Sequence, residues 1–238
     1  MTTAEEKIER VKEIKEVEEI KPLNEKERLL AAWVPKTALG KKVKNGEMTQ
    51  DQIFEKNLPI LEPEIVDSFL ELEEKIVDTK KTTRVVRAGR KFSFRIAALV
   101  GNHDGYVGLG VAKDVEKFQA ATKAARNAKL NLKRVIRGSG SWEEQIQAHS
   151  KHSVPFKVTG KCGSVKITLS PAPRGTGLVV GENIKDVFRF CGITDIWSKT
   201  SGATDTKLNF IRAAINALEK TTKVRAGPEI MKKIEQSE

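Results

Sequence analysis

The sequence contains very few cysteines and no long apolar run. Its 238 residues include two cysteines, Cys162 and Cys191, which excludes a scaffold held together by several disulfides. Two distant thiols are typical of a reducing compartment, so we expect a cytoplasmic protein without membrane contact. No apolar stretch approaches the roughly 20 residues that a bilayer span requires. The acidic, lysine-rich N-terminus does not have the pattern of a signal peptide.

Motifs that carry chemistry are also scarce. His149, His152 and Cys162 do not complete a zinc shell, because no fourth ligand is suggested. No serine or cysteine in the sequence is indicated as a nucleophile that His103 could activate, so acid–base catalysis at this histidine is not expected. The GKK run at 40–42 lacks the first glycine and the preceding strand of a phosphate loop. The sequence therefore predicts no catalytic residue, no cofactor and no metal site.

A glycine-rich turn, Gly175-Thr176-Gly177 followed by Gly181, imitates a dinucleotide-binding fingerprint. In that fingerprint the glycines follow a strand and open a helix directly. Here the apolar segment 178–180 separates the first glycines from the next helix. We favour a tight turn in which backbone meets a neighbour, with nucleotide binding as the alternative.

Acidic residues are nearly absent from one segment of the chain. Residues 81–137 contain 14 Lys and Arg but only three acids, whereas residues 1–80 contain 14 basic and 19 acidic residues. The excess within 81–137 alone equals the net charge of the whole chain, +11. Solvated basic faces normally carry interspersed acids for solubility, so this depletion favours a nucleic acid as partner.

The same segment has the pattern of a small antiparallel sheet covered by a helix. Alternating apolar residues predict strands at 92–100 and 107–111, joined by the turn at 101–105. Asp114 is expected to cap a helix. The apolar stripe of that helix comprises Val115, Phe118, Ala121, Ala125, Ala128 and Leu132. An outward row of cations is expected on its other side, at Lys123, Arg126, Lys133, Arg134 and Arg137.

The N-terminal residues have a different composition. Glu and Lys dominate residues 4–30, which we interpret as a solvated helical arm. Residues 33–75 scatter apolar residues between Pro and Gly, which indicates a looped segment with short helices. The spacing of Ile65, Phe69, Leu72 and Ile76 predicts one helix that leads into the basic unit.

A second unit follows a glycine-serine signal at 138–141. Strands are expected at 154–159 and 165–169 around the turn 160–163, with further short strands at 178–180 and 193–198. The spacing within 184–191 predicts a helix ended by Gly192. Thr204 is expected to cap a last helix, with one apolar stripe at Leu208, Ile211, Ile215 and Leu218. The order of strands and helices gives an α+β fold.

Two runs carry a family resemblance. AGRKFSFRIAALVGNHDGYVGLGVAK, followed by the basic helix, and HSVPFKVTGKCGSVKITLSPAPRGTGLVVG resemble the fifth protein family of the small ribosomal subunit. The resemblance covers residues 33–222. WVPKTALGKKVKNGEMTQDQIFEKNLPILEPEIVD resembles the extension of the archaeal and eukaryotic branch. The modest size and the absence of a long glycine-arginine-rich start indicate an archaeal member.

The resemblance implies a domain organisation. Residues 76–138 are expected to form a domain like the double-stranded-RNA-binding fold without its first helix. After a linker at 139–150, residues 151–222 are expected to form a second α+β domain with a left-handed βαβ crossover, against the general rule. Residues 1–75 are the N-terminal extension and 223–238 a tail.

The resemblance also implies partners. The family binds ribosomal RNA where the body meets the head, contacts the fourth and eighth small-subunit proteins and supports decoding accuracy. With the third and fourth proteins it lines the channel through which messenger RNA enters. A free RNA-binding regulator is the alternative, and a small-molecule kinase-like enzyme a remote one, because that enzyme needs a phosphate loop that the sequence lacks.

Site residues follow from the resemblance and the charge pattern. The expected RNA contacts are Arg84, Arg87, Arg90, Lys91, Lys113, Lys117, Lys123, Arg126, Lys133, Arg134, Arg137, Lys161 and Arg174. The family's loop near the spectinomycin site maps onto Arg84, Val85, Val86, Arg87, Ala88, Gly89 and Arg90. Ala88 stands where many bacterial members have glycine. Contact with the fourth protein is expected at Gly175, Thr176, Gly177, Gly181 and Lys185.

Overall fold

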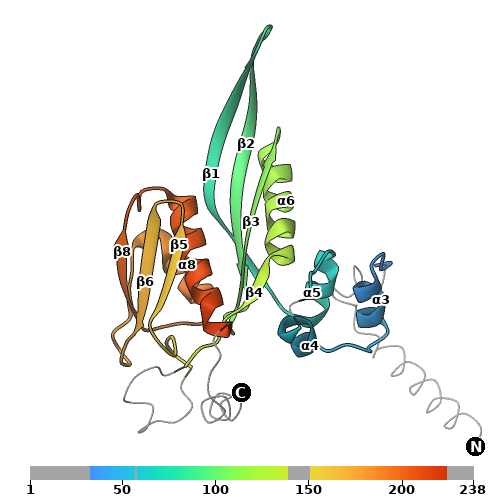
Figure 1. Ribbon diagram of the computed structural model, residues 1–238. Coiled ribbons are helices and arrows are strands. Elements are labelled where there is room, and N and C mark those ends of the chain that lie inside the picture. Colours follow the sequence, from blue (N-terminus) through green and yellow to red (C-terminus); the bar gives the residue numbers. More distant parts are fainter. Residues whose placement is uncertain (1–32, 57, 139–150, 224–238) are drawn as a thin grey trace, which may run out of the picture.

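The computed structural model describes residues 33–56, 58–138 and 151–223 (Figure 1). The predicted arm at 4–30, the linker at 139–150 and the tail beyond residue 223 lie outside the described residues. The described chain forms two four-stranded sheets with helices, preceded by an extension of short helices. This confirms the α+β class predicted from the sequence.

The extension contains helices α3 (Ala38–Lys44), α4 (Gln50–Glu55) and α5 (Pro63–Phe69). The Glu62 carboxylate holds the start of the extension in place. It accepts a hydrogen bond from Trp33 Nε1 at 2.9 Å. It also accepts from the backbone N–H groups of Lys36 and Thr37, at 2.9 and 2.6 Å. Burial opposes the charged form of Glu62, but these hydrogen bonds outweigh it and lower the pKa of this carboxyl. A small core beneath contains Val43, Ile53 and Ile65, and this arrangement confirms the looped segment with short helices.

The predicted helix through Ile76 is wrong beyond Phe69, where α5 ends. The chain enters strand β1 (Glu73–Val86), and the side chain of Ile76 is 48% exposed. β1 pairs with β2 (Gly89–Gly101) along nearly its whole length. These long-range backbone hydrogen bonds override a helical spacing that rested on four residues.

The first sheet has the strand order β1-β2-β3-β4 and is antiparallel, with β3 spanning Tyr106–Asp114 and β4 Leu132–Arg134. Helix α6 (Lys117–Leu130) covers one of its faces. The predicted strands and the turn at 101–105 are confirmed. The β1–β2 hairpin extends well beyond the rest of the sheet (Figure 1).

The predicted apolar stripe of this helix is wrong at its N-terminal end. Val115 and Phe118 are 71% and 86% exposed, whereas the helix buries small residues instead. Those residues are Ala120, Ala124, Ala125 and Ala128. The reason is the close approach of α6 to glycines in β3, where a Cβ on Gly110 would lie 2.0 Å from the carbonyl oxygen of Ala124. Because helix and strand lie so close, only small side chains such as alanine fit between α6 and β3, and a phenylalanine ring does not.

The predicted cap and cation row also require correction. Asp114 ends β3 and accepts a hydrogen bond from the adjacent Val115 N–H at 2.7 Å, while α6 starts later, after Glu116. Because α6 ends at Leu130, Lys133 and Arg134 lie in β4 and Arg137 follows that strand. The basic residues therefore do not form one row on one helix.

The second sheet has the order β5-β6-β8-β7. Its strands are β5 (Val158–Cys162), β6 (Val165–Pro171), β7 (Leu178–Val179) and β8 (Ile196–Ser201). β7 and β8 are parallel and are joined through α7 (Glu182–Phe190), and α8 (Lys207–Thr222) follows β8. α8 packs on β5 and β6 and against α7.

Three elements of this unit start later than predicted. The first strand starts at Val158 instead of residue 154, because the preceding Ser153 exchanges backbone hydrogen bonds with Gly138 at 2.9 Å. The last strand starts at Ile196, because the N–H groups of Thr194 and Asp195 donate to His152 O. α8 begins after Thr206, whose side chain makes no cap hydrogen bond, instead of after Thr204.

The two sheets share one hydrophobic core. Leu99, Val107 and Val135 of the first unit belong to the same buried cluster as Phe188 and Ile211 of the second. The turn after β2 adds polar contacts: the N–H groups of His103 and Gly105 donate to the carbonyls of Phe190 and Cys191 at 3.0 and 3.1 Å. These contacts fix the two sheets relative to each other, and the β1–β2 hairpin projects away from the junction (Figure 1).

Candidate nucleic-acid interface

The tip of the β1–β2 hairpin is a two-residue turn. Val86 pairs with Gly89, so Arg87 and Ala88 alone form the turn, and Gly89 has a positive φ of 127°. The predicted antibiotic-loop residues 84–90 all lie at this tip, divided between the end of β1, the turn and the start of β2. The three arginines of the tip, Arg84, Arg87 and Arg90, are exposed. The tip therefore presents guanidinium groups to a partner at the end of a long arm.

Strand register gathers like charges on one face of the first sheet. Arg84 is paired directly with Lys91, and Arg95 is paired with Lys80 on one side and with Lys113 on the other. Directly paired residues share a face. This is the face opposite α6, because the alternate residues of β2, such as Ile96, pack against α6. We call these five residues the cationic sheet face.

Like charges at paired positions destabilise a sheet. Between Asp78 and the hairpin tip, the side of the sheet that carries these five cations has a single acid among the described residues. That acid is Asp78, which lies at the end far from the tip. A row of such pairs is offset when a polyanion lies across it, because phosphate groups neutralise both members of a pair. The pairing of like charges on this face therefore suits a polyanionic partner.

The predicted RNA-contacting cations fall into two groups in the structure. One group is exposed and makes no ion pair or side-chain hydrogen bond within the described residues: Arg84, Arg87, Arg90, Lys91, Lys113, Lys117 and Lys161. The other group pairs with acids of the same chain: Lys123 with Asp114, Arg126 with Glu64, Lys133 with Glu219, Arg134 with Asp51, and Arg137 with Asp104. Arg174 lies exposed beside the glycine turn.

The paired cations connect parts of the chain that are distant in sequence. Arg126 reaches Glu64 in α5 at 3.6 Å, and Arg134 lies 3.9 Å from Asp51 in α4. Lys129, which was not predicted to bind RNA, contacts Asp67 and Glu74 at 2.9 and 3.1 Å. Burial disfavours its ammonium, but the two carboxylates outweigh that effect and raise the pKa of Lys129. These side chains attach the extension to α6 and β4, whereas the arginines at the hairpin tip remain unpaired within the described residues.

Sequence reasoning missed Lys80 and Arg95. Arg95 alternates with the apolar residues of its strand, so a period of two already placed it on the opposite face from Ile96. Lys80 required the strand register, which depends on the two-residue turn at Arg87-Ala88.

The glycine turn makes internal hydrogen bonds. Gly175 and Gly177 have φ of 81° and 71°, and the N–H of Gly177 donates to Asp195 Oδ1 at 2.8 Å. As predicted, β7 lies between these glycines and α7, for which Gly181 is the N-cap residue. Lys185 pairs with Glu182 at 2.6 Å. A tight turn explains Gly175 and Gly177 without a nucleotide.

Neither a metal site nor a membrane span is evident in the part of the chain that the structure describes. No group of three or more His, Cys, Asp and Glu side chains gathers there, and no helix there is long and apolar enough to cross a bilayer. Cys191 is buried, and its burial raises the pKa of the thiol.

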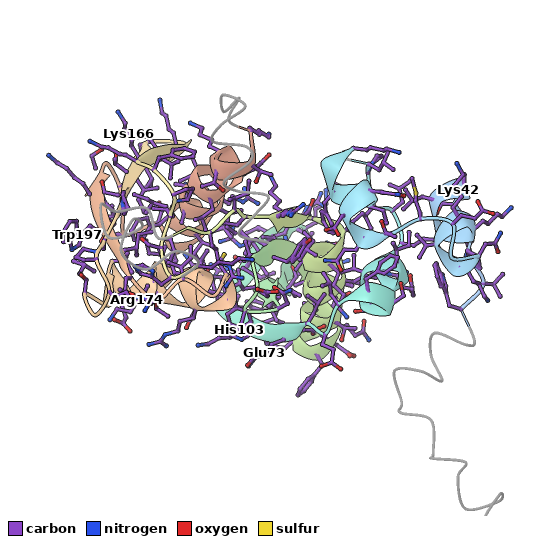
Figure 2. The ribbon with its side chains drawn as sticks, turned by 90° about the horizontal axis from the view of Figure 1, so that it is seen from below. Lys42, Glu73, His103, Lys166, Arg174 and Trp197 are labelled. Carbon is purple, nitrogen blue, oxygen red and sulfur yellow. The ribbon has the colours of Figure 1, made fainter. Side chains whose placement is uncertain are left out.

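His103 joins the first sheet to α7 of the second unit: one ring nitrogen contacts Glu73 of β1 and the other contacts Arg189 of α7. Nε2 lies 2.7 Å from a carboxylate oxygen of Glu73, and the two residues are labelled in Figure 2. Nδ1 lies 2.8 Å from the carbonyl oxygen of Arg189. The ring stacks on Phe190 at a centroid distance of 5.2 Å. Both partners accept hydrogen bonds, so the arrangement suits the imidazolium form. The hydrogen bond to Glu73, then that to Arg189, raises the pKa of His103 above its usual value.

We expect the contribution of His103 to stability to depend on pH. Since its pKa is raised in the folded protein, this contribution is fully present below the unfolded pKa of about 6.5 and is lost as pH rises through the folded pKa. Half of the side chain is exposed, so it is expected to amount to at most about 1 kcal/mol. His103→Asn, which tolerates the positive φ of 57°, is expected to lower the free energy of unfolding at acidic pH and progressively less above neutrality.

NMR titration of the imidazole measures the pKa directly, and Glu73→Gln is the matched control. The control keeps an acceptor near Nε2 but removes its charge, so it is expected to bring the pKa of His103 back toward the usual value. A pKa at or below about 6.5 in the wild type would contradict the assignment.

Comparison with known proteins agrees with the two-sheet architecture. The family model "Ribosomal protein S5, N-terminal domain" matches residues 72–136, and "Ribosomal protein S5, C-terminal domain" matches residues 160–233. The small ribosomal subunit protein uS5 of Staphylothermus marinus is 49% identical over 196 residues, which cover 82% of this chain and 91% of that protein.

Two further uS5 proteins show similar identity. That of Methanothermobacter thermautotrophicus is 46% identical over 204 residues, covering 85% of this chain and 94% of its own. That of Hyperthermus butylicus is 50% identical over 194 residues, which cover 80% of this chain and 90% of that protein. The chain therefore belongs to the uS5 family of structural proteins of the small ribosomal subunit.

Proposed function

We propose that this protein binds ribosomal RNA through the β1–β2 hairpin and the cationic sheet face, at the junction of body and head of the small subunit. The observation that supports this most is the direct pairing of like charges, Arg84 with Lys91 and Lys80 with Arg95. Family membership implies ribosomal RNA and ribosomal proteins as partners and makes the chain a structural ribosomal protein. A kinase-like enzyme and a free regulator are therefore not favoured.

The mode of binding follows from the side chains. Arginine forks at a narrow hairpin tip suit pairs of phosphate oxygens. The interface presents Lys and Arg, and the deep, narrow major groove of RNA helices keeps side chains from the base edges, so it contacts phosphates and reads the shape of folded RNA more than its bases. The hairpin is narrow and long enough to insert between RNA helices, and its free cations lie at its tip and along one face.

The finer assignments rest on the family. They include contacts with the fourth, eighth and third small-subunit proteins, a position beside the channel through which messenger RNA enters, and support of decoding accuracy. The turn at Gly175–Gly177 with Gly181 and Lys185 is the surface proposed for the fourth protein, supported by open space around Gly175 and Gly177. We propose the same domain bounds, 76–138 and 151–222, with the first like a double-stranded-RNA-binding domain and the second crossing over left-handed through α7.

Replacing Arg87 and Arg90 by alanine tests the hairpin contact. Two lost phosphate contacts are expected to lower the slope of log affinity for small-subunit ribosomal RNA against log salt by about 1.4–1.8, at roughly 0.7–0.9 per contact. Filter binding over a range of salt concentrations measures this slope. Both arginines are exposed and unpaired within the described residues, so the variant is expected to fold normally.

Arg189→Ala with Arg212→Ala is the matched control. These two arginines are also exposed but lie on α7 and α8 of the second unit. The control removes the same charge and is expected to leave the slope within error of the wild type. Equal slopes for the hairpin variant and the wild type would remove Arg87 and Arg90 from the interface.

A further inference from the structure

Among the described residues, one face of the second sheet is covered by no helix and carries no acid. α8 packs on one side of β5 and β6, where Val165, Ile167 and Leu169 are buried. The alternate residues of the strands point to the opposite side, which we call the open sheet face. The residues on this face that carry the inference are Lys161, Lys166, Thr168, Val179, Trp197 and Lys199.

Strand register connects these residues into a path. Lys161 is paired with Lys166, and Thr168, two residues further along β6, is paired with Lys199. Trp197 precedes Lys199 by two residues on β8, so it lies on the same face. Trp197 is in turn paired with Val179 on the edge strand β7. Cations thus lie along the face and lead to an aromatic side chain near its edge.

The cations on this face have no acid to neutralise them. Lys161, Lys166 and Lys199 are exposed and make no ion pair within the described residues. Lys161 and Lys166 occupy directly paired positions, where like charges repel and destabilise the sheet. As on the cationic sheet face, a polyanion would offset this repulsion. Charge complementarity therefore selects an anionic partner.

The aromatic residue narrows the class of partner. Trp197 is 46% exposed and Val179 is 51% exposed, so an apolar, flat surface is presented to solvent beside the lysines. Lysine is depleted in the cores of protein–protein interfaces. Surfaces that combine a cationic path with an exposed aromatic ring bind single-stranded nucleic acid, because a base that is not stacked in a duplex stacks on the ring.

We propose that the open sheet face binds a single-stranded segment of RNA, with one base stacked on Trp197 and the phosphates contacted by Lys199, Lys166 and Lys161. This surface is separate from the hairpin. Figure 2 shows Lys166 and Trp197 projecting from the second sheet, at the end of the molecule opposite Lys42 of the extension. The protein thus has two RNA surfaces of different character, one for folded RNA and one for an unpaired strand.

A local reporter distinguishes this surface from the hairpin. The chain contains three tryptophans, so Trp33→Phe with Trp142→Phe leaves Trp197 as the single one in the full-length protein. An oligouridylate of about 10 nucleotides, within the usual site sizes of such surfaces, is expected to quench Trp197 fluorescence in a saturable titration. RNA bound only at the hairpin does not contact this ring and leaves its fluorescence unchanged.

Charge variants in the same background test the path of lysines. Lys166→Gln with Lys199→Gln is expected to lower the salt slope of the quench-derived affinity by about 1.4, at roughly 0.7 per contact with a single strand. Lys41→Gln with Lys42→Gln, which removes the same charge from α3, is the control and is expected to leave the slope unchanged. All four side chains are exposed and make no ion pair or hydrogen bond within the described residues, so folding is expected to be preserved.

Results of three kinds would overturn the proposal. The first is the absence of quenching at saturating oligouridylate. The second is an equal salt slope for the open-face variant and the wild type. The third is equal quenching by polyglutamate, which would assign the face to an acidic protein, or by a duplex of the same length, which would exclude base stacking.

Discussion

Replacing Phe188 by alanine is expected to lower the free energy of unfolding by about 3–5 kcal/mol. Phe188 lies on α7, is 0% exposed, and belongs to the core cluster that joins the two sheets. Removing the ring leaves a cavity among side chains from both units, including Leu99 and Ile211, which backbone pairing prevents from collapsing. Urea unfolding followed by circular dichroism measures the change.

Phe118→Ala is the matched control, because the same side chain is removed from a helix at an exposed position. Phe118 is 86% exposed on α6, and its replacement is expected to change stability by no more than about 0.5 kcal/mol. Comparable losses for the two variants would show that α6 buries Phe118, as its spacing in the sequence suggests, and would contradict the alanine-lined packing of this helix.

Replacing Gly110 by alanine is expected to lower the free energy of unfolding by more than about 3 kcal/mol. A Cβ at this position would lie 2.0 Å from the carbonyl oxygen of Ala124 and 2.2 Å from the backbone nitrogen of Ala128. Both atoms belong to the backbone of α6, so relief requires the whole helix to move off the sheet instead of a rotamer change. Urea unfolding measures the loss, and amide exchange in α6 locates it.

Gly46→Ala separates this steric effect from backbone strain. Gly46 has a positive φ of 75° and no atom within 4 Å of the added Cβ. The expected cost is about 1–2 kcal/mol, which is the penalty of a left-handed conformation alone. If Gly110→Ala cost no more than Gly46→Ala, α6 would not lie as close to β3 as the structure shows.

Local patterns in the sequence were sufficient for several features. Alternating apolar residues and turn glycines predicted the β2–β3 hairpin, and the i, i+3, i+4 spacing predicted α7. The depletion of acids between residues 81 and 137 predicted a polyanionic partner, because charge requires no knowledge of the fold. The two family-specific runs predicted the uS5 family, which the comparisons confirm.

Only the tertiary structure decided which apolar residues of α6 are buried. The sequence spacing pointed to Phe118, but the glycines of β3 draw the helix so close that its alanines form the contact. Such a choice depends on the distance between two elements, which local periodicity does not contain.

The tertiary structure also decided which cations remain free. Arg126 and Arg134 look equivalent to Arg87 in the sequence, yet α5 and α4 bring Glu64 and Asp51 to the first two. Strand register, which long-range backbone pairing fixes, decided which basic residues of the first sheet share a face. The sequence by itself therefore predicted a polyanionic partner, and long-range packing determined which cations remain unpaired within the described residues.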